Sequence, residues 1–343
     1  MVKKDKNELN SVKGAVYIPA RAFNAPQMWK HYSSRETERD MGFAASIGLN
    51  GLRVWVSWEY WREAAEHFET NFNDFLEKTS ARGIGILVSL FENCGVPPTD
   101  ENMWTTDPCK AFAINSPHKE EIVAVPDRWN EPQKFVEWFM ERYRDDDRLL
   151  AIELMNEPRQ VDGLRFARAM FRTAAAMRGD VPLTIGACNL IDNMYFMEFG
   201  LDILQFHKNF PPSEDEMRKT IEQAVKVGDV LDKPVWLTEW QRIRRSGSGF
   251  GKKQVTDEEL SPNYATLFSI VHSCEIGAFF WSLMVKPAYL GGQRRKGTYN
   301  GLFWEDGAVW SLADARAISG NPALQLEERP EWPDWGPPQN WRG

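Results

Sequence analysis

Cysteine is scarce in this chain, which has four cysteines among 343 residues and no C-x-x-C spacing between them. A chain of this length buries enough core to fold without disulfide bonds, so we expect reduced thiols. The five histidines are also few, and none stands in an H-E-x-x-H pattern or a similar metal-binding spacing. We therefore predict no metal site and no other cofactor.

Long apolar runs and an excess of basic residues are missing as well. No stretch of about 18 apolar residues occurs, and the charged N-terminus has no apolar signal segment. Lys and Arg number 41 against 49 for Asp and Glu, and no basic cluster is interleaved with aromatic residues. We expect no membrane or nucleic-acid partner and a cytoplasmic location, or secretion if a signal peptide has been removed. The composition leaves the oligomeric state open.

What the sequence does contain is a repeated alternation of short apolar runs with segments of helical periodicity, which is typical of parallel strands joined by helices. The apolar runs predict eight strands, at residues 15–21, 51–57, 83–91, 149–158, 183–187, 203–209, 234–240 and 277–284. Intervening helices are predicted at 34–47, 72–82, 131–144 and 163–177. This pattern indicates an α/β fold, a (β/α)8 TIM barrel that forms a single domain over residues 1–343.

Three long loops are predicted to follow strand ends, at residues 92–130, 241–260 and 286–301. Loops at the C-terminal ends of barrel strands form the active sites of this fold, so three of them predict a walled cleft or pocket there. Residues 326–343 form a tail rich in Trp and Pro. We expect Trp332, Trp335 and Trp341 to hold this tail against the barrel surface.

Two carboxylates lie at predicted strand ends. Glu157 follows Asn156 at the end of the strand 149–158, and Glu239 lies near the end of the strand 234–240, 82 residues later. A pair of carboxyl groups can hydrolyse a glycosidic bond, because one protonates the leaving oxygen while the other attacks the sugar or activates water. The two residues therefore predict a glycoside hydrolase.

Other polar or aromatic side chains also lie at strand ends, where barrel enzymes bind their substrates. They are Arg53, His207, Asn209 and Trp281. Glu153 lies further down the strand that carries Glu157, and we interpret it as a buried partner for an arginine. His207 has a competing interpretation as an ordinary core histidine, and Trp281 as barrel filling.

At these residues the chain resembles family 5 of the glycoside hydrolases, whose members are retaining (β/α)8 enzymes. The resemblance implies that Glu157, in the Asn-Glu-Pro motif, is the acid/base and that Glu239 is the nucleophile. It also implies that Arg53 lies beside the nucleophile, and that His207 and Trp281 belong to the substrate site.

Two strand ends depart from the family pattern. The chain has His207-Lys-Asn209 where the family commonly has His-x-Tyr, so the tyrosyl hydrogen bond to the nucleophile is missing or comes from another residue. It has Phe91-Glu92-Asn93 where the family commonly has a histidine. We expect Asn209, Phe91 and Glu92 to contact the substrate, and the departures to affect substrate choice more than mechanism.

The chemistry sets further expectations. A general acid must carry a proton near neutral pH, so we expect a raised pKa at Glu157, whereas Glu239 must stay ionised. Arg53 would keep Glu239 ionised through its charge and a hydrogen bond. Asn156 would bind the 2-hydroxyl of the sugar, and Trp281 would lie beneath the ring.

The most specific hypothesis is a retaining hydrolase of β-1,4-mannosides or short oligosaccharides, that is, a β-mannosidase or β-mannanase. An endo-β-1,4-glucanase (cellulase) is the alternative substrate class, because fold and catalytic pair do not select the sugar. A transglycosylase would use the same residues. A non-catalytic carbohydrate-binding barrel is the alternative from another class, and retention of both carboxylates with Arg53 argues against it. The partner in each case is an oligosaccharide or polysaccharide.

Overall fold

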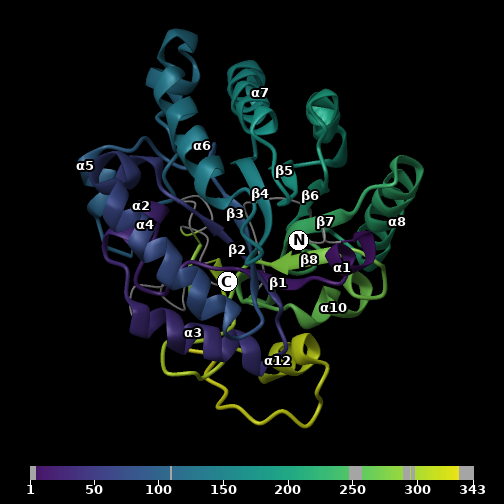
Figure 1. Ribbon diagram of the computed structural model, residues 1–343. Helices are drawn as coiled ribbons and strands as arrows, with labels where there is room; N and C mark the ends of the chain where they lie inside the picture. Colours follow the sequence, from purple (N-terminus) through teal and green to yellow (C-terminus); the bar gives the residue numbers. More distant parts are fainter. Residues whose placement is uncertain (1–4, 109, 247–256, 289–293, 295–297, 332–343) are drawn as a thin grey trace.

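A computed structural model describes residues 5–108, 110–246, 257–288, 294 and 298–331. Eight parallel strands form one sheet with the order β5-β4-β3-β2-β1-β8-β7-β6 (Figure 1). They are β1 (Lys13–Val16), β2 (Gly51–Trp55), β3 (Gly85–Ser89), β4 (Leu149–Asn156), β5 (Leu183–Gly186), β6 (Leu204–Lys208), β7 (Val235–Trp240) and β8 (Gly277–Phe280). Each strand overlaps the range predicted for it. The predicted (β/α)8 barrel is therefore confirmed.

Helices surround the strands (Figure 1). They are α1 (Lys6–Asn10), α2 (Ala25–Lys30), α3 (Ser34–Ser46), α4 (Trp58–Ser80), α5 (Asp100–Trp104), α6 (Asn130–Tyr143), α7 (Gln160–Ala176), α8 (Glu214–Leu231), α9 (Asp257–Leu260), α10 (Ala265–Val271) and α12 (Leu312–Ser319), with the shorter turns η1 (Lys119–Val123), η2 (Pro126–Arg128) and η3 (Leu190–Phe199). No helix in these described ranges is both long and apolar enough to cross a membrane.

Helix α4 begins earlier than the predicted helix at 72–82. The hydroxyl of Ser57 accepts a hydrogen bond from the backbone N–H of Tyr60 and caps the helix, and one non-helical residue, Ala64, interrupts it. Phe68, Phe72, Phe75 and Leu76 repeat at helical spacing and are fully buried. The helix therefore begins earlier than predicted, because the Ser57 cap and the buried Phe68 precede residue 72 and extend the apolar stripe toward the N-terminus.

The first strand is shifted toward the N-terminus relative to its prediction, because Pro19 has no N–H to donate to a neighbouring strand.

The predicted loop 92–130 is not irregular throughout, since it holds α5, η1 and η2. The loops predicted at 241–260 and 286–301 are described in part. The latter contains β9 (Lys286–Pro287), which pairs with β10 (Tyr299–Asn300).

The N-terminal mouth of the barrel is apolar. Leu87, Ala151, Ile203, Trp236 and Phe279 point inward from the strands and form one buried cluster with Leu9 and Val12. Helix α1 closes this end, where the backbone oxygen of Leu9 accepts a hydrogen bond of 2.7 Å from the indole N–H of Trp236.

Above this apolar layer the interior is polar. Gln205 donates to the hydroxyl of Thr184 at 3.0 Å and accepts from the hydroxyl of Thr238 at 2.8 Å. Arg53 and Glu153 lie in the same interior and are fully buried. Because side chains alternate along each strand, the outward-facing residues remain apolar and pack against the helices.

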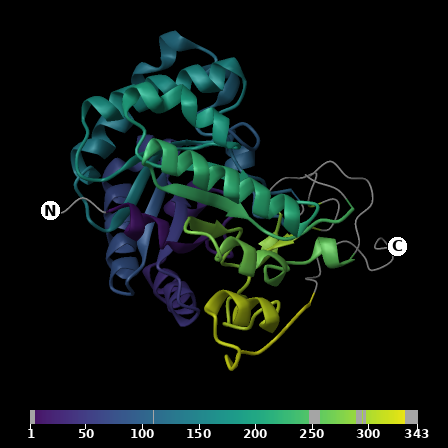
Figure 2. The ribbon, with the colours of Figure 1, turned by 90° about the vertical axis from the view of Figure 1, so that its right-hand side faces the viewer.

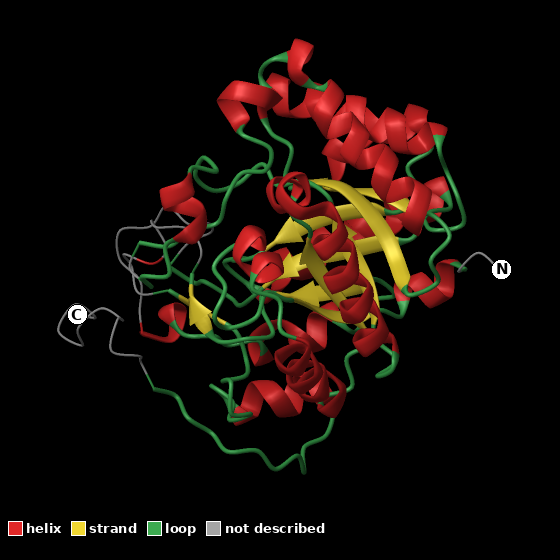
Figure 3. Ribbon diagram, turned by 60° about the vertical axis from the view of Figure 1, so that its left-hand side comes forward, coloured by secondary structure: helices red, strands yellow, loops and turns green. Residues whose placement is uncertain are grey.

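The C-terminal ends of the strands point toward one side of the molecule. Figure 3 shows the arrowheads directed to the side that carries the short β9–β10 pair, and Figure 2 shows α1 at the opposite end. Residues 326–331 of the predicted tail pass beside the barrel, where Val309 donates to the backbone oxygen of Glu327 at 2.8 Å. Trp332, Trp335 and Trp341 lie outside the described residues.

Cys94, Cys188 and Cys274 are free thiols, as expected, and Cys109 lies outside the described residues. The single domain over residues 1–343 remains a prediction.

Candidate active site

Glu157 follows the last residue of β4 and has a left-handed backbone conformation, with φ 44°. This region is costly for a residue with a Cβ atom, so surrounding contacts must hold it. The backbone N–H of Glu157 donates to Gly186 at 2.7 Å, and its backbone oxygen accepts from the side chain of Asn93 at 2.9 Å. Both contacts fix the direction in which the carboxylate leaves the strand.

Three groups contact the carboxylate of Glu157. Nδ1 of His207 lies 2.8 Å from one oxygen, while the thiol of Cys94 donates to the other at 3.1 Å. The guanidinium group of Arg159 donates to the same oxygen as the thiol, and its Nε donates to Cys188 at 3.0 Å.

These contacts overturn the expected pKa of Glu157. Burial alone would raise the pKa, but the hydrogen bond and charge of His207 and the charge of Arg159 outweigh it, and the pKa is lowered to about 2. The prediction of a raised pKa is therefore wrong for the unliganded protein. Glu157 is ionised there at neutral pH.

Glu239 lies at the end of β7 and is buried. Nη1 of Arg53 donates to one of its oxygens at 2.8 Å, and the amide of Asn209 donates to the other at 2.9 Å. Gln241 donates to the amide oxygen of Asn209 at 3.0 Å, which fixes the orientation of that amide. Asn209 thus supplies a side-chain hydrogen bond to Glu239 from the position two residues after His207.

Glu153, which we predicted as a buried partner for an arginine, forms an ion pair with Arg53. Nε of Arg53 donates to Glu153 at 3.0 Å and Nη2 at 2.6 Å, a bidentate contact between two fully buried groups. Gly186 makes room for this pair, because a Cβ atom there would lie 2.7 Å from an oxygen of Glu153.

Asn156 connects Arg53 with the end of β3. Its amide oxygen accepts from Nη2 of Arg53 at 2.6 Å, and its amide nitrogen lies 2.9 Å from both carboxyl oxygens of Glu92. The backbone N–H of Cys94 also donates to Glu92, at 2.6 Å. Burial raises the pKa of Glu92 to about 8, against the opposing hydrogen bonds from Cys94 and Asn156.

Glu157, His207 and Glu239 converge closely enough that one ligand atom of each lies within 4.8 Å of the others. Nδ1 of His207 is 3.7 Å from an oxygen of Glu239 as well as 2.8 Å from Glu157. A cation would find three ligand atoms here, but Arg53 and Arg159 already bring positive charge to the two carboxylates. We interpret the group as a pair of carboxylates separated by an imidazole.

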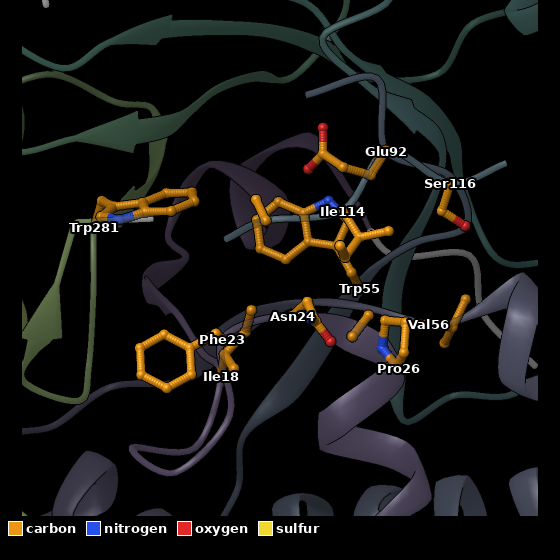
Figure 4. Close-up of a pocket in the computed structure, with 12 residues that line it drawn as sticks. Ile18, Phe23, Asn24, Pro26, Trp55, Val56, Glu92, Ile114, Ser116 and Trp281 are labelled. Carbon is orange, nitrogen blue, oxygen red and sulfur yellow. The ribbon is translucent and has the colours of Figure 1, made fainter. Parts of the chain in front are cut away.

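A cavity open to solvent, of about 430 Å³ with its open mouth, is lined by Glu92 (Figure 4). Trp281 and Trp55 line it as well, and their rings meet edge to face with centroids 5.8 Å apart. Glu92 lies on the opposite wall from Trp281 in this view. The cavity therefore has an aromatic face and a carboxyl group in its wall, and Glu92 is connected to Glu239 through Asn156 and Arg53.

We predicted that Phe91 contacts the substrate, but its side chain does not line the cavity. Its ring is buried and packs edge to face against Phe135 of α6 and Phe166 of α7, outside the barrel. Strand alternation explains the error, since neighbouring side chains on β3 face opposite sides and only Glu92 lines the cavity.

Cys94, Arg159 and Trp55 also belong to this site, although no prediction from the sequence included them. Cys94 and Arg159 follow the ends of β3 and β4 by a few residues, in loops without periodicity, so no local pattern marks them. Trp55 could have been found, because it is the last residue of β2 and lies two positions after Arg53 on the same face.

The fold and these residues define a (β/α)8 barrel with two carboxylates at the C-terminal ends of its strands. No protein-family model matches the sequence, and no curated protein is similar to it in sequence. Several solved structures share the fold. The endo-1,4-β-D-mannanase of Thermotoga petrophila RKU-1 is 16% identical, with a TM-score of 0.59 over 90% of this chain and 98% of that one.

Two other solved structures are similar to the same extent. An exo-β-1,4-mannosidase from Opitutaceae bacterium strain TAV5 is 16% identical, with a TM-score of 0.61 over 90% of this chain and 58% of that one. A glycoside hydrolase family 5 mannosidase from Rhizomucor miehei is 14% identical, with a TM-score of 0.58 over 90% of this chain and 92% of that one. At these identities the likeness establishes the fold.

Proposed function

We propose that this protein is a retaining β-glycoside hydrolase of the family 5 type, with Glu239 as nucleophile and Glu157 as acid/base. One observation carries the proposal: an oxygen of each carboxylate lies within 4.8 Å of the other. Retaining glycosidases place their carboxyl groups about 5–5.5 Å apart, whereas inverting enzymes need about 6.5–9.5 Å to admit a water.

The surroundings of Glu239 suit a nucleophile. Hydrogen bonds from Arg53 and Asn209 favour its ionised form, and its oxygens lie at the mouth of the barrel. In the first step Glu239 would form a bond to the anomeric carbon as the glycosidic bond breaks. The departing oxygen would take a proton from Glu157, which would then remove a proton from the water that hydrolyses the glycosyl-enzyme.

Glu157 needs a proton before the first step, because it is ionised in the unliganded protein. His207 is the adjacent group that can share one, since its Nδ1 lies 2.8 Å from the carboxylate. A proton that moves from Nδ1 to Glu157 would leave a neutral imidazole and a carboxylic acid. The short contact between His207 and Glu157 thus gives His207 a role that a core histidine would not have.

The proposed substrate is a short β-1,4-linked mannoside. One feature supports it: the fold is shared with a mannanase and two mannosidases. Chromatography of products from manno- and cello-oligosaccharides of equal length tests this choice. Cleavage of the cello-oligosaccharides alone would replace it with a β-1,4-glucanase, and products longer than the starting oligosaccharide would indicate a transglycosylase.

The mechanism is tested by replacing the nucleophile. We expect Glu239→Ala to lower turnover of an aryl β-glycoside by at least about 10⁴-fold, and added azide to restore it with formation of the inverted glycosyl azide. Product configuration is read by NMR. A suitable control is Glu66→Ala, which removes an exposed carboxylate on the outer helix α4 and should leave turnover unchanged.

A Glu239→Ala variant with undiminished activity would refute the assignment of the nucleophile. A wild type that binds oligosaccharides tightly and hydrolyses none of them would instead support a non-catalytic binding barrel.

A further inference from the structure

The cavity that Glu92 lines has few polar groups in its wall. Most of its lining is apolar or aromatic, and the polar side chains are Asn24, Glu92 and Ser116 together with the indole N–H groups of Trp55 and Trp281. A ligand in such a cavity is oriented by the few groups that can still form hydrogen bonds.

Two of these polar side chains are committed within the protein. The amide of Asn24 accepts from the backbone of Gln27 at 2.9 Å and donates to the backbone oxygen of Met103 at 3.2 Å. The hydroxyl of Ser116 donates to Glu59 at 2.7 Å. Neither is free to turn toward a ligand without breaking these contacts.

The indole N–H of Trp55 has no hydrogen-bond partner among the described residues, and the side chain is only 4% exposed. Its ring is held on two sides, by the guanidinium group of Arg53 at 4.6 Å from the ring centroid and by the edge-to-face contact with Trp281. A buried donor without a partner is costly, and this ring cannot rotate to find one. A ligand in the cavity would supply the acceptor.

Glu92 has acceptor capacity left in its ionised form. An ionised carboxylate offers about four lone-pair positions, and Asn156 and Cys94 occupy three of them: two on Oε1 and one on Oε2. Figure 4 shows the carboxyl group directed into the space beside Trp55, with Trp281 across the cavity.

This wall is linked to the nucleophile by a chain of three hydrogen bonds. Glu92 accepts from Asn156, Asn156 accepts from Arg53, and Arg53 donates to Glu239. Arg53 also lies over the ring of Trp55, so the same guanidinium group contacts the nucleophile and the cavity wall.

We propose that Glu92 and the indole N–H of Trp55 form a hydroxyl-binding pair that determines which sugar the site accepts. One hydroxyl of the reacting sugar accepts a hydrogen bond from Trp55 and donates one to Oε2 of Glu92. The inference rests on the proposed hydrolase function and adds to it the residues that select the substrate.

The test measures kcat/KM for wild type, Trp55→Phe and Glu92→Gln. The substrates are the aryl β-mannoside, or the β-glucoside if the wild type prefers it, and its monodeoxy analogues, each lacking one hydroxyl. We expect both substitutions to lower kcat/KM on the parent glycoside about 10- to 100-fold. On the one analogue that lacks the bound hydroxyl, the same substitutions should change kcat/KM less than about threefold.

Trp61→Phe is the matched control. Its indole N–H is also buried without a partner, but Trp61 lies on α4, where it packs against Phe135 and Trp138 away from the cavity. It should leave kcat/KM unchanged on every analogue. Unfolding midpoints of all variants show whether a loss of activity reflects a loss of fold.

Equal losses on the parent and on every analogue would overturn the hydroxyl-binding pair and leave the proposed function standing. A wild type that cleaves none of these glycosides, together with failure of azide to rescue Glu239→Ala, would instead defeat the proposed function.

Discussion

At the scale of single residues, the environment of Glu157 decides how the site behaves. Burial in a barrel raises the pKa of a carboxyl group, and the sequence suggested no more than that. The folded protein adds His207 and Arg159 as direct partners, and the pKa is lowered to about 2 instead. The fold thus favours the ionised form of Glu157 in the unliganded protein.

Replacing Arg159 tests this arrangement. The charge of Arg159 favours ionised Glu157, so Arg159→Gln should raise the pKa of Glu157. The protonated acid would then persist to higher pH, and the basic limb of the pH profile of kcat/KM should move upward. Arg165→Gln, at an exposed position on the same helix α7, is the control. A basic limb that stays in place or moves to lower pH would show that Arg159 does not control the acid/base.

At the scale of elements, one buried lysine joins two loops of the catalytic face. Lys286 of β9 extends its side chain to the loop after β1, where its ammonium group donates to the backbone oxygens of Ile18, Pro19 and Ala22 at 2.8–3.1 Å. Ile18 lines the cavity, so this contact positions part of its wall. Burial lowers the pKa of Lys286 to about 7.

Lys286→Met should lower the free energy of unfolding by about 2 kcal/mol at pH 7, because it leaves buried carbonyl groups without a donor. The loss should grow between pH 7 and pH 10. Over that range the unfolded lysine, with a pKa near 10.5, binds more protons than the folded one, so the wild type gains stability as the pH rises. Denaturant unfolding at both pH values measures the effect, with exposed Lys219→Met as control.

At the scale of the whole molecule, strand pairing is least extensive between β5 and β6, the two ends of the strand order. A single parallel bridge, Thr184 with Ile203, joins these strands. Asn193 of η3 completes the seam, because its side chain accepts from the backbone N–H of Gln205 at 3.0 Å and donates to its backbone oxygen at 2.7 Å. The side chain of Asn193 thus supplies two hydrogen bonds to the backbone of β6 that a neighbouring strand would otherwise supply.

Asn193→Ala should destabilise the protein by about 2–4 kcal/mol, since two buried backbone groups of β6 lose their partners. Chemical denaturation measures the change. Asn189→Ala serves as control, because this asparagine is exposed in the same segment and bonds only to Asp192 among the described contacts. A loss below about 1 kcal/mol would mean that water or a neighbouring strand satisfies Gln205.

The sequence determined the architecture and the two central carboxylates of this protein. Apolar runs that alternate with helical segments require a parallel barrel, and strand ends then mark where Glu157 and Glu239 must lie. The same reasoning located Arg53, Asn156 and His207. These inferences succeed because periodicity and strand ends are local properties of the chain.

The tertiary structure alone decided the partners of those residues. Arg159 and Cys94 reach Glu157 from loops, Asn209 donates a hydrogen bond to Glu239, and Phe91 faces outward. Each outcome depends on the stagger and closure of strands that are far apart in the sequence. Because a pKa or a hydrogen bond depends on atoms a few ångströms away, it is fixed only when those strands meet.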